Sequence, residues 1–236
     1  MSESWNAVFW DLGGVILDPE SIKRGRELFV AGLSVTFGLE TTQAIEVWDT
    51  ELGSYFRERD GQEFRPAHQG YEQTVAEVVG EPVSVDEWLP LAIQAVDVAF
   101  EPSDGAGQTL ETLANAGYYL GVISDIDAWE AEFILTVLGV RDYFEHVTTS
   151  SEVGMTKPAP AMFERALEKA PVKPDAALFV GDRYENDMRG GTEAGFHTVA
   201  YGGTAAARAT EDDPNVDLQI DDLREILELV GLESDG

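Results

Sequence analysis

The sequence predicts an α/β fold, a three-layer core with a parallel β-sheet and an inserted all-helical domain. Two observations predict this class. After residue 100, short apolar runs alternate with segments of helical periodicity, a pattern typical of a parallel sheet with right-handed crossovers and helices on both faces. Before residue 100, one long stretch has helical periodicity and no convincing strand. The chain has 236 residues, of which 44% are hydrophobic, so it can bury such a core.

The first strand is predicted at 7–10, an apolar run that ends in the turn Asp11-Leu12-Gly13-Gly14. Further strands are predicted downstream from short apolar runs, with a weaker one last: 118–123, 146–149, 177–180, 197–200 and 216–220. Helical periodicity fills the intervals between them: 105–116, 128–138, 159–170 and 186–194.

Four helical segments are predicted in the stretch that interrupts this alternation: 22–37, 42–56, 66–79 and 85–100. They follow the first strand directly and contain no strand signal. We therefore expect two domains, an α/β core made of residues 1–18 and 101–236 and a helical domain made of residues 19–100.

The protein is strongly acidic: it has 45 Asp and Glu residues and only 15 Lys and Arg residues, which gives a net charge of −30. Such a surface repels nucleic-acid phosphates and anionic membranes, so neither partner is expected. The acidic residues are spread along the chain and only four of the basic residues are lysine. This pattern favours a halophilic protein, whose self-repulsion is screened by high salt, over an ordinary acidic enzyme.

Cysteine is absent, which excludes disulfides, thiolate metal sites and thiol nucleophiles. No apolar run is long enough to cross a bilayer, and no basic region precedes the first apolar stretch. These features predict a cytoplasmic protein. They do not decide between a monomer and a homodimer.

Polar residues follow several predicted strands, where the carboxyl ends of parallel strands form the usual ligand site. Asp11 follows the first strand, Ser124 and Asp125 the second, and Asp182 the fourth, with Asp187 five residues later. Each alone is equally compatible with a turn or a helix cap. Lys157, before the helix at 159–170, is by itself an ordinary surface cation. Their convergence on one edge of the sheet favours a functional site.

The residue types at this edge indicate phosphoryl transfer. Clustered carboxylates repel one another unless a cation binds, and oxygen ligands suit Mg²⁺. The expected metal ligands are Asp11, the main-chain carbonyl of Gly13, Asp182 and Asp187. Asp11 is also the expected nucleophile, because a carboxylate can form an aspartyl-phosphate. Ser124, Asp125 and Lys157 are expected to bind the phosphate, and Ser124 and Lys157 to stabilise its transition-state charge.

Four segments resemble the motifs of the haloacid dehalogenase-like hydrolase superfamily, in the same order and at similar spacing: 8–15 (VFWDLGGV), 122–125 (VISD), 157–158 (KP) and 180–187 (VGDRYEND). The resemblance implies a Rossmann-like core, Asp11 as nucleophile and a Mg²⁺-dependent phosphatase of small phosphorylated metabolites. It also implies that the helical insertion is a cap that closes over the site and sets the substrate.

Gly13 departs from the family pattern, because its phosphatases usually carry a second Asp there as general acid and base. General acid–base help contributes about 10²–10⁴-fold to a rate, so we expect a slow enzyme or one that prefers good leaving groups. Two alternatives stay open: a metal-independent 2-haloacid dehalogenase, whose halide leaves without a proton, and a catalytically impaired binding protein. Against the dehalogenase, the acidic fourth motif is intact.

Overall fold

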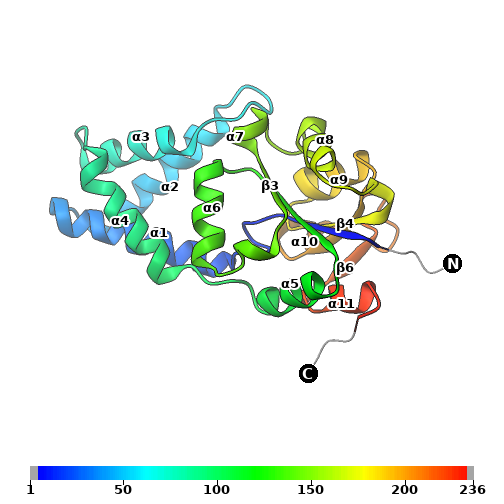
Figure 1. The fold of residues 1–236 in the computed structure, drawn as a ribbon. Coiled ribbons are helices and arrows are strands. Elements are labelled where there is room, and N and C mark those ends of the chain that lie inside the picture. Colours follow the sequence, from blue (N-terminus) through cyan, green and yellow to red (C-terminus); the bar gives the residue numbers. More distant parts are fainter. Residues whose placement is uncertain (1–4, 233–236) are drawn as a thin grey trace. The chain divides into compact units, whose positions relative to one another are not determined.

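The structure is a computed structural model that describes residues 5–232. The chain divides into two compact units, shown in Figure 1: an α/β unit formed by the chain up to Pro19 and from Pro102 onward, and a helical unit, Glu20–Glu101.

The α/β unit is built on a parallel sheet whose six strands, in the described part of the chain, lie in the order β3-β2-β1-β4-β5-β6. The strands are β1 (Ala7–Trp10), β2 (Tyr119–Ser124), β3 (His146–Thr149), β4 (Ala177–Gly181), β5 (His197–Tyr201) and β6 (Leu218–Ile220). All neighbouring strands pair in parallel. Because β2 and β3 lie on one side of β1 and β4 to β6 on the other, strand order reverses beside β1, where open sheets bind ligands.

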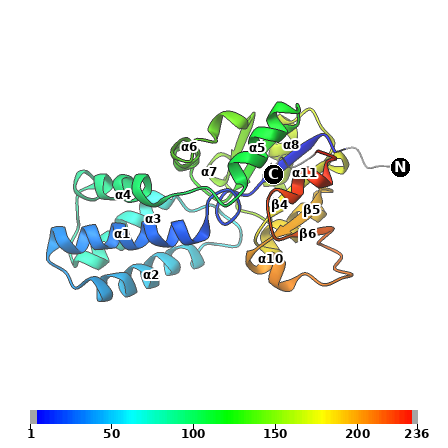
Figure 2. The same cartoon turned by 90° about the horizontal axis from the view of Figure 1, so that it is seen from below.

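Helices cover both faces of this sheet (Figures 1 and 2), which confirms the predicted fold class. Those of the α/β unit are α5 (Ala106–Asn115), α6 (Ala128–Val137), α7 (Ser150–Val153), α8 (Pro160–Lys169), α9 (Gly190–Glu193), α10 (Gly203–Arg208) and α11 (Glu225–Leu229). Short 3₁₀ turns form η1 (Arg141–Tyr143) and η2 (Pro174–Ala176). The continuous helix predicted at 186–194 is wrong in detail: the π-helical segment η3 (Tyr184–Arg189) precedes α9.

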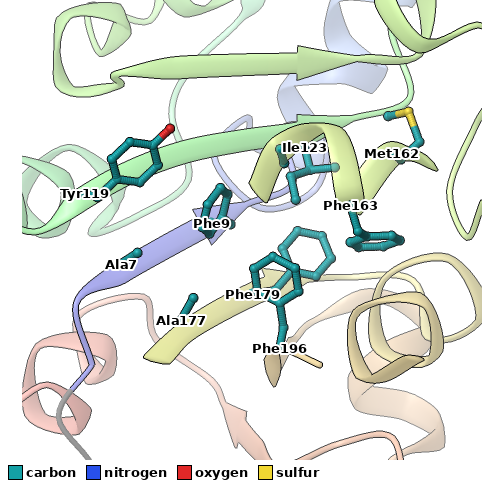
Figure 3. Close-up of a cluster of buried hydrophobic side chains, with 10 residues drawn as sticks. Ala7, Phe9, Tyr119, Ile123, Met162, Phe163, Ala177, Phe179 and Phe196 are labelled. Atoms are coloured by element: carbon teal, nitrogen blue, oxygen red, sulfur yellow. The ribbon is translucent and has the colours of Figure 1, made fainter. Parts of the chain in front are cut away.

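An aromatic cluster holds the centre of the sheet (Figure 3). Phe9 of β1, Phe163 of α8, Phe179 of β4 and Phe196 pack together, with the Phe9 and Phe196 rings 5.2 Å apart and the Phe163 and Phe179 rings 5.5 Å apart. All four residues of β1 are buried, as expected for a strand covered on both faces. The residue that follows β1 is therefore held on a rigid support.

The helical unit contains α1 (Pro19–Phe37), α2 (Thr41–Arg57), α3 (Ala67–Val79) and α4 (Val85–Ala99). Ser84 and Glu87 form a capping box that starts α4. Phe29, Trp48 and Trp88 form the centre of its core, with the Phe29 and Trp48 rings 5.0 Å apart. This unit thus has a hydrophobic core of its own. No helix in the described range is both long and apolar enough to span a membrane.

Candidate active site

Asp11 lies directly after β1, in the middle of the sheet's carboxyl edge. Its main-chain N–H donates to the carbonyl of Val180 on β4 at 2.9 Å, which extends the strand pairing by one residue. The residue is only 5% exposed, and Oδ1 accepts a hydrogen bond from the N–H of Leu12 at 2.8 Å. This hydrogen bond orients the carboxylate at the end of the strand.

Asp187 reaches the same edge from η3. A Cβ on Gly181 would lie 2.3 Å from the Asp187 Cβ, so only glycine at position 181 permits this approach. Asp187 Oδ2 accepts hydrogen bonds from the main-chain N–H groups of Asp182 at 3.1 Å and Arg183 at 2.9 Å. Burial raises the pKa of the Asp187 carboxyl, and Lys157 opposes that increase.

Lys157 carries the cation at the centre of the site. It is 1% exposed, and its Nζ lies 3.0 Å from Asp11 Oδ1 and 2.7 Å from Asp187 Oδ1. Burial alone lowers the pKa of a lysine, but the carboxylates of Asp11, Asp187 and Asp125 outweigh it and raise the pKa of Lys157 above its ordinary value. The ammonium group therefore stays charged and links two carboxylates that otherwise repel each other.

Asp182 completes a group of three carboxylates with Asp11 and Asp187, whose nearest oxygens all lie within 4.8 Å of one another. Burial, and next the charge of Asp11, raises the pKa of Asp182. Asp182 Oδ1 is buried and has no hydrogen-bond partner in the described part of the chain. Unpaired, acceptor-only oxygens at this spacing fit a Mg²⁺ ion. Asp187 Oδ1 likewise accepts no hydrogen bond within the described residues, but it lies 2.7 Å from Lys157 Nζ. Asp187 Oδ2 accepts two main-chain hydrogen bonds, so Asp182 is the carboxylate with the most free capacity for a direct metal bond.

Two glycines beside Asp11 have separate structural roles. Gly14 has a φ of +84°, and a Cβ there would lie 2.7 Å from Asp182 Oδ2, so glycine is required for the turn and for the approach of Asp182. Gly13 forms an isolated bridge with Leu17 in the same turn. Metal binding by the Gly13 carbonyl stays a prediction.

Ser124 and Asp125 follow β2, the strand next to β1. Ser124 is 5% exposed and lies at the carboxyl edge beside the Asp11 turn. The Asp125 carboxylate accepts hydrogen bonds from inside the protein, from the main-chain N–H of Lys157 at 2.7 Å among others. Phosphate binding by Ser124 or Asp125 stays a prediction. The Asp125 carboxylate is already used by these internal hydrogen bonds, which makes a direct contact of its side chain with phosphate unfavourable.

The structure thus brings together Asp11, Lys157, Asp182 and Asp187 in direct contact or within a few ångströms. Two neighbouring residues, Arg183 and Asn186, are not in the predicted site. Despite the desolvation that opposes it, the pKa of Arg183 is raised by the nearby carboxylates, Asp11 first among them. Arg183 could have been recognised as a site residue from the sequence, because it directly follows Asp182 in a chain with few basic residues.

Comparisons with known proteins agree with this geometry. Residues 5–195 match the family model of haloacid dehalogenase-like hydrolases. A glyceraldehyde 3-phosphate phosphatase of Methanopyrus kandleri is 36% identical over 127 residues, 52% of this chain and 53% of that protein. The chain spans about half the length of the curated relatives it matches.

Two solved structures share the fold over nearly the whole chain. The HAD phosphatase from Thermococcus onnurineus has a TM-score of 0.70 at 24% identity, with 97% of this chain and 99% of that chain covered. The L-2-haloacid dehalogenase from Xanthobacter autotrophicus with chloropropionic acid covalently bound has a TM-score of 0.69 at 18% identity, with 97% and 100% covered. The match of the family model to residues 5–195, with the site at the end of β1, shows that the chain belongs to the haloacid dehalogenase-like hydrolase family.

Proposed function

We propose that this protein is a phosphatase of small phosphorylated metabolites that uses Asp11 as nucleophile and a divalent cation, Mg²⁺, as cofactor. The observation that carries the proposal is the arrangement around Lys157, whose Nζ links Asp11 and Asp187 beside the unpaired oxygen of Asp182. The similarity to proteins named glyceraldehyde 3-phosphate phosphatase supports the same activity. We propose a small phosphorylated metabolite as substrate class on that basis.

The chain's own residues provide the covalent chemistry. The carboxylate of Asp11 attacks the phosphorus atom, an O–P bond forms, and the bond from phosphorus to the leaving oxygen breaks. Water then attacks the aspartyl-phosphate and releases inorganic phosphate, which regenerates Asp11. Lys157 and Ser124 hold the equatorial phosphate oxygens, whose charge must be neutralised in the transition state. When bound by Asp11, Asp182 and Asp187, with the Gly13 carbonyl, Mg²⁺ supplies further charge neutralisation.

Gly13 limits the leaving groups that this site can expel. A glycine cannot give a proton to a departing alkoxide, and Lys157 is occupied by two carboxylates. We therefore expect acyl and aryl phosphates to react faster than alkyl phosphates. The helical unit, Glu20–Glu101, is proposed to act as the cap that selects among substrates.

The test is a turnover assay in molar KCl with acetyl phosphate, p-nitrophenyl phosphate and a panel of sugar phosphates, each with Mg²⁺ or with EDTA. Phosphate release that needs Mg²⁺ and is lost in Asp11→Asn supports the proposal. A matched control is Asp175→Asn, because Asp175 is exposed in η2, away from the carboxyl edge of β4.

The second candidate is a 2-haloacid dehalogenase, which Gly13 favours because a halide leaves without protonation. Chloride release from 2-chloropropionate that is insensitive to EDTA, with no phosphate release, would replace the phosphatase proposal by this one. No turnover of any substrate, together with measurable Mg²⁺ binding, would instead indicate a binding protein.

A further inference from the structure

Asp125 connects three separate segments of the α/β unit through one carboxylate. Oδ1 accepts hydrogen bonds from Ser150 Oγ at 3.0 Å and from the main-chain N–H of Lys157 at 2.7 Å. Oδ2 accepts a hydrogen bond from Asn186 Nδ2 at 3.2 Å. Both oxygens are therefore bound within the protein, which is the pattern of a residue that holds the site together.

The three partners lie where the site needs support. Ser150 is the buried first residue of α7, and Lys157 lies in the loop before α8. Asn186 belongs to η3 and immediately precedes Asp187. Asp125 thus fixes the main chain that carries Lys157 and the turn that carries Asp187, whose side chains meet at 2.7 Å.

We infer that Asp125 is a positioning residue for phosphoryl transfer, which sets the Lys157 ammonium group between Asp11 and Asp187. This inference rests on the proposed function. All three partners of Asp125 donate, so the position needs a group that accepts at both oxygens, and a carboxylate is the side chain that does so. Asparagine has the same shape, but its NH₂ group would face the NH₂ group of Asn186 in the amide orientation seen here, so a hydrogen bond is regained only if the Asn186 amide turns over. The charge of Asp125 also contributes to the raised pKa of Lys157.

The pair Asp125 and Asn186 permits a swap experiment. Asp125→Asn places two donors against each other, and Asn186→Asp places two carboxylates against each other. The double variant Asp125→Asn with Asn186→Asp restores one donor and one acceptor with the direction of the bond reversed. It leaves the acceptor oxygen for Ser150 and Lys157 in place and keeps the net charge of the wild type. Asp175→Asn is the control for the single charge change.

The readouts are kcat and KM for acetyl phosphate and p-nitrophenyl phosphate at saturating Mg²⁺, with crystal structures of the variants. Asp125→Asn should lose one hydrogen bond to a charged group and let Lys157 shift by about 1 Å. We therefore expect kcat to fall by roughly 10- to 100-fold. The fall is expected for both substrates, because Lys157 acts on the phosphoryl group they share. KM changes little, and the double variant recovers about tenfold or more of kcat. The variant structure shows Lys157 Nζ displaced from Asp11 or Asp187.

Several outcomes would overturn the inference. One is a swap that recovers no activity, and another is a loss confined to KM, which would mean that Asp125 binds substrate directly. Lower thermal stability with wild-type kcat would leave Asp125 with a structural role only. If the wild type itself releases no phosphate, the proposed function fails, but the structure of Asp125→Asn still decides the positioning role: Lys157 in its wild-type place would refute it.

Discussion

Lys157 is the residue whose removal tests most directly how the site is held together. In Lys157→Met a buried cation is replaced by an apolar side chain of similar length. Asp11 and Asp187, which face Lys157 Nζ at 3.0 and 2.7 Å, are then left together with no cation between them. Removing one partner of a buried ion pair costs about 3–5 kcal/mol, because the remaining charge stays desolvated. We expect Lys157→Met to lose about that much free energy of unfolding near neutral pH.

The loss of unfolding free energy in Lys157→Met should depend on pH. A carboxyl whose folded-state pKa is raised destabilises the fold when it is ionised, and protonation relieves that cost as the pH falls through the raised pKa. Burial already raises the pKa of Asp187 and Asp182, and loss of the lysine charge raises both further. The deficit of Lys157→Met should therefore be largest near about pH 8 and shrink toward about pH 5.5.

The assay is urea unfolding followed by circular dichroism, in high KCl with EDTA so that no divalent cation contributes. The control is Lys173→Met, since Lys173 is exposed and has no ion pair within the described residues; its effect should stay within about 0.5 kcal/mol. A Lys157→Met deficit no larger than that of the control would refute the reasoning. A deficit equal at both pH values would refute its electrostatic origin.

Three further predictions concern the same site and the net charge. Asp182→Asn should weaken Mg²⁺ binding measured by calorimetry at least about tenfold, because Asp182 Oδ1 is buried and has neither a hydrogen bond nor an ion pair within the described residues. Unchanged affinity would exclude Asp182 as a ligand. Gly14→Ala should destabilise the protein by about 1 kcal/mol or more, since its φ is +84° and its Cβ would meet Asp182 Oδ2 at 2.7 Å; unfolding at the wild-type urea concentration would contradict that. With a net charge of −30, the unfolding midpoint should rise between about 0.1 and 2 M KCl as salt screens self-repulsion, and a constant midpoint would count against halophilic adaptation.

The fold and much of the site follow from local pattern, because both depend on strand ends. Apolar runs that alternate with helical periodicity predict the parallel sheet, and the sheet brings residues 11 and 182 to one edge since β1 and β4 pair directly. The same convergence predicts Lys157 at this edge as a phosphate-binding cation, but its ion pairs with Asp11 and Asp187 are visible only in the structure.

Two features of the site depend on contacts that no local pattern contains. The sequence around 186–194 has ordinary helical periodicity, but η3 is π-helical where the Asp187 side chain binds the main-chain N–H groups of residues 182 and 183. The hydrogen bond from Asn186 to Asp125 joins residues 61 positions apart. Side-chain hydrogen bonds of this kind are fixed only by tertiary packing. The sequence therefore predicts Asp125 as a phosphate-binding residue and gives no signal for the role of Asn186.

The charges at the carboxyl edge bear on the choice between the two candidate reactions. Four carboxylates and two cations gather there: Asp11, Asp125, Asp182, Asp187, Lys157 and Arg183. Phosphate esters and 2-haloacids are both anions, so either substrate meets a net negative site within a net negative protein. A metal-independent reaction must bind its anion against that repulsion, whereas a divalent cation on Asp11 and Asp182 cancels the excess negative charge of the site. Inorganic phosphate should accordingly bind in Mg²⁺ and not in EDTA. Equal binding in both would remove the main electrostatic argument against the dehalogenase.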